Sequence, residues 1–94
     1  MTTPDALYPV LMLPDDIIGM KQAQVLSGRD PRTIRRLCQQ FGIGHQTMQN
    51  APWEISAPAL VMVRHGDYAA LELLRCGNRE HPRVKRVLNY LGLP

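Results

Sequence analysis

The chain lacks most of the features that would mark a secreted, membrane or metal-binding protein. It has two cysteines, Cys38 and Cys76, each at an apolar helical position without a second ligand at metal spacing. No apolar run approaches the ~18 residues of a membrane span. The N-terminal residues 1–5 do not begin a signal peptide, which would have a basic region followed by a long apolar region. We therefore expect an intracellular protein with reduced, buried packing cysteines, no metal and no membrane; nothing in the sequence supports a disulfide.

Catalytic groups are also sparse. His45, His65 and His81 are scattered, and no paired carboxylates, nucleophile elbow or glycine-rich phosphate loop lies near them. Tyr68 or Tyr90 close to several arginines would suit a strand-transfer tyrosine, but a chain of 94 residues has too little room for that active site. We expect neither enzymatic activity nor a cofactor.

What the chain does have is a small folded domain with clustered positive charge. Apolar residues make up 45% and charged residues 20%, which argues against disorder. The net charge of +3 is unevenly spread, because residues 20–50 and 75–94 are basic whereas residues 1–19 and 51–74 are acidic. Most of the cations are arginines, whose forked guanidinium suits phosphate and guanine. This bias points to a specific anionic partner.

The most informative stretch is a helix predicted over residues 31–41. Asp30 can cap its start, Pro31 suits its first position and Gly42 can end it in a left-handed conformation. One stripe repeats at i, i+3, i+4 and i+7 and predicts a buried face: Ile34, Leu37, Cys38 and Phe41. The opposite face has no carboxylate and consists of Arg32, Thr33, Arg35, Arg36, Gln39 and Gln40. A solvated face is the alternative, but the missing acidic partners and the neighbouring elements favour DNA contact.

The neighbours of this helix predict a helix-turn-helix followed by a wing. Residues 20–26 form a short helix closed by Ser27 and Gly28, and a turn of about three or four residues leads to the next helix. The side chains available to pack this first helix are Met20, Ala23, Val25 and Leu26. Residues 43–48 and 53–55 are predicted strands of a small hairpin. Stacking of Trp53 on a base is an alternative, but its place before a helix start and its alternation with Ile55 favour core packing.

Three more helices are predicted after the hairpin. Ser56 caps a helix, with Pro58 in its first turn, that is apolar nearly all round. A further helix runs over residues 68–76, and the last one runs from Pro82 to Leu91. The predicted fold is therefore mainly α with a small β-hairpin wing: a winged helix-turn-helix with two additional C-terminal helices.

Several other polar groups are candidates for DNA phosphate or minor-groove contact, with plain solvation as the alternative. Those near the first helix and its turn are Lys21, Gln22 and Arg29. Those on the hairpin are His45, Gln46, Gln49 and Asn50. Those on the last helix are Arg83, Lys85 and Arg86.

The N-terminal residues 1–17 form an apolar arm. Pro4, Pro9 and Pro14 exclude a helix there, and the segment is rich in apolar side chains. These either cover the domain's own core or dock on another molecule. For docking between neighbouring copies on DNA the candidates are Leu7, Tyr8, Val10, Leu11 and Leu13.

Two runs of sequence resemble a known family. Residues 20–28 with 30–36 resemble the compact winged helix-turn-helix of MerR-like excisionases, and residues 53–60 resemble that family's post-wing strand and helix entry. The predicted organisation is the arm (1–17), a winged helix-turn-helix DNA-binding domain (18–66) and a C-terminal helical extension of the same domain (67–94). The arm and the extension depart from a minimal excisionase.

The resemblance implies a recombination directionality factor of a mobile genetic element. Such proteins bind attachment-site DNA, often as several copies side by side, and bend it so that a separate integrase favours excision. Double-stranded DNA and an integrase would be the partners, in the nucleoid of the cytoplasm. A transcriptional regulator built on the same domain is an alternative, and a small antagonist that uses the arm and the apolar helices to bind a protein partner is a third.

Overall fold

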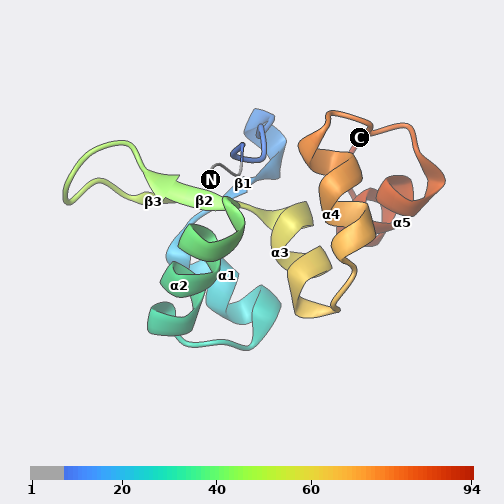
Figure 1. Ribbon diagram of the computed structural model, residues 1–94. Coiled ribbons are helices and arrows are strands. Elements are labelled where there is room, and N and C mark those ends of the chain that lie inside the picture. Colours follow the sequence, from blue (N-terminus) through green and yellow to red (C-terminus); the bar gives the residue numbers. More distant parts are fainter. Residues whose placement is uncertain (1–7) are drawn as a thin grey trace.

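Five α-helices, one short 3-10 helix and three strands make up residues 8–94, the part of the chain that the computed structural model describes (Figure 1). The chain is mainly helical. In order, the elements are η1 (Pro14–Asp16), β1 (Ile17–Ile18), α1 (Met20–Ser27), α2 (Pro31–Phe41), β2 (Gly44–Gln46), β3 (Trp53–Ser56), α3 (Ala57–Arg64), α4 (Tyr68–Arg75) and α5 (Pro82–Leu91).

The helix ends follow local capping chemistry. The Asp30 carboxylate accepts a hydrogen bond from the Thr33 backbone N–H at 2.8 Å and begins α2, and Gly42 ends this helix with φ +66°. Ser56 and Asp67 cap α3 and α4 in the same way, each accepting a backbone N–H three residues later. These boundaries confirm the predicted helices.

The three strands form an antiparallel sheet in the order β1-β3-β2. Ile55 in the central strand is paired with Ile18 on one side and with Gly44 on the other. The β2–β3 hairpin was predicted, although β2 ends earlier, at Gln46, and β3 continues to Ser56. The two-residue strand β1 was not predicted, and it joins the end of the N-terminal segment to the hairpin.

Close packing between α2 and the sheet requires a glycine at position 44. A Cβ atom there would lie 2.6 Å from Cys38 Sγ and 3.0 Å from Ile55 Cγ1. Cys38 itself is buried as predicted, and burial raises the pKa of its thiol to about 11. The prediction of a buried cysteine was wrong for Cys76, which is exposed because α4 ends one residue before it. Both cysteines are free thiols.

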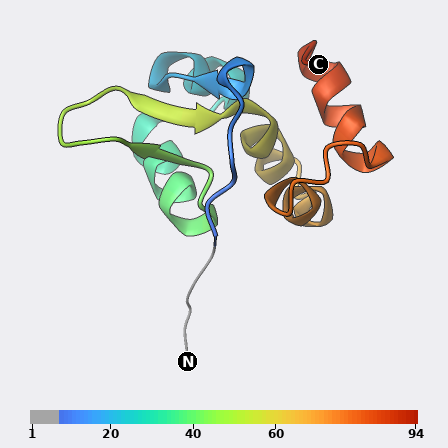
Figure 2. The same cartoon turned by 90° about the horizontal axis from the view of Figure 1, so that it is seen from above.

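The core is centred on α3. Every residue of this helix from Ala57 to Val63 is buried, and it contacts α1, α4, α5 and β3. Figure 2 shows it between the α1–α2 pair and the α4–α5 pair. On α1, Ala23 is buried and Met20 and Leu26 are partly buried against the core, but the expectation for Val25 was wrong, because its side chain is 83% exposed. No helix in residues 8–94 is long and apolar enough to span a bilayer.

The described part of the N-terminal segment covers the domain's own core. Val10 is 2% exposed, and its backbone N–H donates to the Gly42 carbonyl at 2.9 Å. Val10 is therefore not available to a neighbouring copy, which corrects its prediction as a docking residue. Leu7 lies outside the described residues. The other three candidates are exposed: Tyr8, Leu11 and Leu13.

Candidate nucleic-acid interface

The polar face of α2 points away from the core. Ile34 and Cys38, which are almost fully buried, fix the orientation of the helix. Five of the six side chains predicted to face DNA are exposed: Arg32, Arg35, Arg36, Gln39 and Gln40. Thr33 is half-buried at the start of the helix, where its backbone N–H bonds to Asp30. The structure thus brings the predicted set together on one accessible surface.

This face of α2 carries positive charge that is not neutralised. Arg32, Arg35 and Arg36 have no ion-pair partner among residues 8–94, whose four ion pairs lie elsewhere. The nearby acid is Asp30, and hydrogen bonds from Thr33, followed by the charge of Arg32, lower the pKa of its carboxyl. An anion approaching the middle of α2 would therefore meet guanidiniums without competing carboxylates.

A short, internally bonded turn sets the position of α2 relative to α1. Gly28 ends α1 with φ +70°, and the Ser27 hydroxyl donates to the Ala23 carbonyl at 2.7 Å while accepting the Arg29 N–H at 3.2 Å. Arg29 is exposed in this turn. The turn thus places one more cation beside the first turn of α2.

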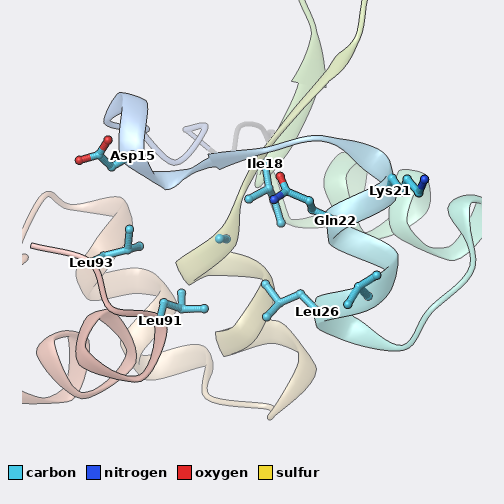
Figure 3. Close-up of a pocket in the computed structure, with 9 residues that line it drawn as sticks. Asp15, Ile18, Lys21, Gln22, Leu26, Leu91 and Leu93 are labelled. Atoms are coloured by element: carbon cyan, nitrogen blue, oxygen red, sulfur yellow. The ribbon is translucent and has the colours of Figure 1, made fainter.

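The start of α1 lies at a distinct surface. Lys21 and Gln22 are exposed, and both line a hollow whose other walls come from the beginning of the sheet and the end of the chain (Figure 3). Ile18 and Leu91 make those walls largely apolar. The other residues that line this hollow are apolar apart from Asp15 and include no cation. Phosphate contact by Lys21 or Gln22 stays a prediction.

The hairpin projects from the body of the molecule, as both overall views show (Figures 1 and 2). Its four predicted contact residues are all exposed: His45, Gln46, Gln49 and Asn50. Two of them also shape the loop, since Gln46 Nε2 donates to the Ala51 carbonyl at 2.8 Å and Asn50 has φ +67°. Trp53 is partly buried against the core, which agrees with its predicted packing role.

The three cations predicted on α5 differ in their surroundings. Arg83 Nε bonds Asp67 Oδ1 at 2.9 Å, and Lys85 Nζ lies 3.2 Å from Glu80 Oε1. Burial opposes the charge on Asp67, but the hydrogen bonds from Arg83 and from the Ala70 backbone, together with the charges of Arg83 and Arg86, outweigh it and lower the pKa of this carboxyl. Arg86 is exposed and has no ion pair within the described part of the chain.

Sequence reasoning missed two side chains that border the α2 surface. Arg64 and Tyr68 line a hollow of about 480 Å³ together with Arg29 and Arg36. Tyr68 is 52% exposed and stacks on Phe41, with ring centroids 5.6 Å apart. Nothing local in the sequence links Arg64 to Arg36, since they line the same hollow only because of where the end of α3 lies relative to α2.

Comparison of the chain with protein-family models, with curated proteins and with solved structures gave no match in any of the three. In residues 8–94, no group of three His, Cys, Asp or Glu side chains lies close enough together to hold a metal ion. The polar face of α2 with its surrounding cations is thus the surface on which a functional interpretation rests.

Proposed function

We propose that this chain is a sequence-specific, architectural DNA-binding protein with a winged helix-turn-helix fold, in which α2 is the recognition helix. One observation carries the proposal: α2 presents three unpaired guanidiniums on an exposed face that is free of carboxylates. Arginine can bridge O6 and N7 of guanine, and glutamine can pair with N6 and N7 of adenine. Such a face is therefore suited to reading base edges.

The dimensions of α2 support insertion in the major groove. Its 11 residues give a length of about 16 Å at 1.5 Å per residue, and the groove of B-DNA admits an α-helix. Arg32, Arg35 and Arg36 lie in the N-terminal half of α2, the part of a recognition helix that contacts bases. The exposed hairpin would act as the wing and contact an adjacent backbone or minor groove.

The role that we propose for DNA binding is that of an excisionase, a recombination directionality factor. It rests on the resemblance of residues 20–36 and 53–60 to that family. The protein would bind attachment-site DNA beside a separate integrase and would have no chemistry of its own. Exposed side chains of the N-terminal segment provide apolar surface for contact between neighbouring copies: Tyr8, Leu11 and Leu13.

Substitution of the α2 arginines tests the DNA-binding proposal. We expect Arg35→Ala and Arg36→Ala each to weaken binding to a selected site. Loss of an arginine that reads a base should cost about 1–3 kcal/mol of binding free energy and should relax the sequence preference at one base position. The measurement is selection from a randomised duplex pool, followed by titration. The control for sequence preference is Lys85→Ala, which also removes one positive charge and should leave the preference unchanged, because a phosphate contact carries no sequence information. Unchanged affinity and sequence preference in the double variant would overturn the assignment.

Footprinting on DNA that flanks the gene tests the excisionase role. A series of adjacent protected repeats is expected of an architectural factor that binds as several copies. An isolated palindrome would instead indicate a dimeric transcriptional regulator, because palindromy mirrors two-fold protein symmetry.

A further inference from the structure

Three adjoining hollows connect α2 with α5. The first is bordered by Arg29, Arg36 and Arg64. The second shares Arg64 with it and adds His65 and Tyr90. The third shares His65 and Tyr90 with the second and adds Arg86. These shared walls make one continuous surface, which we call the basic track and define by Arg29, Arg36, Arg64, His65, Arg86 and Tyr90.

The basic track carries an excess of unneutralised positive charge. None of its four arginines has an ion-pair partner among residues 8–94. The acid among the residues that line these hollows is Asp67, which borders only the third. It is bonded to Arg83, and the charge of Arg86 also acts on it. One shared carboxylate leaves most of the charge in the row without a counterion, and a polyanion that follows the row would neutralise it.

The arrangement of the charges favours an extended polyanion over a small anion. Arg36 and Arg86 border different hollows, on helices that lie on opposite sides of α3 (Figure 2). They therefore do not converge on one point, as the ligands of a single phosphate would. A duplex presents phosphates every 3.4 Å or so along each strand, which fits cations spaced along a surface.

We propose that the basic track binds the sugar–phosphate backbone of the same duplex whose major groove receives α2. This inference rests on the proposed function and extends its contact surface to the end of α3 and to α5. The track begins at Arg29 and Arg36, beside the polar face of α2, so one duplex reaches both. Arg64 and Arg86 bind phosphates, and the hydroxyl of Tyr90, a residue 70% exposed, donates to the backbone.

Backbone contacts of this kind add affinity without sequence preference. The salt dependence of binding reports them, because each neutralised phosphate releases counterions and contributes about −0.9 to the slope of log K against log salt. Loss of one such arginine therefore changes the slope and weakens binding to every sequence alike. Loss of a base-reading arginine changes the sequence preference.

The test measures binding of the full chain to a labelled 30-bp duplex of mixed sequence between about 50 and 300 mM salt, a range over which the phosphate term is large. We expect Arg64→Gln and Arg86→Gln each to make the slope less steep by about 1, and the double variant by about 2. The matched controls are Arg64→Lys and Arg86→Lys, which keep the charge at the same positions. Their slopes should equal that of the wild type, because the slope reports the number of neutralised phosphates.

A second measurement uses the unaltered protein, so it does not depend on how the variants fold. Phenylglyoxal modifies exposed arginines, and mass spectrometry locates the products. We expect the duplex to protect Arg64 and Arg86 together with the arginines of α2. Equal labelling of Arg64 and Arg86 with and without the duplex would overturn the proposal.

The outcomes separate this proposal from the proposed function. If the wild type binds DNA and the α2 variants lose sequence preference, but Arg64→Gln and Arg86→Gln keep the wild-type slope, the basic track is not a DNA contact and the recognition helix stands. If the wild type shows no salt-dependent duplex binding, both proposals fail.

Discussion

Asp16 is the buried acid of residues 8–94, with 1% of its surface exposed. Its two carboxylate oxygens accept hydrogen bonds from the Arg79 guanidinium at 3.0 and 3.1 Å, and Oδ2 also accepts the Leu13 backbone N–H at 3.1 Å. A buried charge is stable only when it is paired and hydrogen-bonded. This single side chain thus joins the N-terminal segment to the loop that precedes α5.

We predict that Asp16→Asn lowers the free energy of unfolding by about 2–3 kcal/mol, because it leaves the Arg79 charge unpaired at a partly buried position. Urea denaturation measures the effect. Asp15→Asn is the control, since Asp15 is exposed and one residue away, and its effect should stay within about 0.5 kcal/mol. Equal unfolding midpoints for the two variants would show that the pair contributes little.

At the scale of single elements, the sequence predicts helices well, because their signals are local. The N-cap Asp30, the first-turn Pro31 and the left-handed Gly42 lie within or next to α2, so its limits need no knowledge of the rest of the chain. The exposed polar face follows from the same pattern, since burial of Ile34 and Cys38 determines the opposite side.

What the sequence does not predict depends on long-range packing. Strand β1 has two residues, and it exists because Ile18 pairs with Ile55, far along the chain. Val25 was expected to pack, but the position of α3 determines which side of α1 is buried. Arg64 was missed for the same reason, because only the folded chain brings it to the hollow that Arg36 also lines. The spacing of apolar residues shows which face of a helix is buried, but not which other element packs against that face.

The tip of the β2–β3 hairpin can be altered without disturbing the core, so its part in DNA binding can be tested by itself. Its loop, residues 47–52, is exposed apart from Ala51, which is half-buried. We predict that replacing this loop by Asn-Gly leaves the protein folded, because Gln46 and Trp53 already pair and a two-residue turn suits such a pair. If the hairpin is a wing, affinity for a duplex should fall several-fold while the melting temperature changes little.

The shortened hairpin retains His45 and Gln46, so the substitution tests the tip alone. Fluorescence anisotropy with the selected site measures affinity, and circular dichroism follows unfolding. Wild-type affinity in a folded, shortened protein would mean that Gln49 and Asn50 do not contact DNA, and that only the start of the hairpin can do so.

At the scale of the whole molecule, the N-terminal segment is fastened to the domain but leaves apolar side chains exposed. Arg75 donates to the backbone carbonyls of Tyr8 and Phe41, and Val10 lies in the core. After these attachments, Leu11 is 78% exposed and Leu13 is 51% exposed. Deleting the segment would remove Val10 from the core as well, so point substitutions are the appropriate probe of association.

We predict that Leu11→Gln with Leu13→Gln abolishes cooperative binding to a duplex that carries several sites, whereas affinity for a single site is unchanged. Both residues are exposed, so the fold does not need their side chains, and exposed apolar side chains are candidates for an interaction site. The control is Val25→Gln, which alters an equally exposed apolar residue on α1. Titrations on one-site and multi-site duplexes give the two affinities. Undiminished cooperativity in the double variant would show that the copies associate through another surface, or only through the DNA that they share.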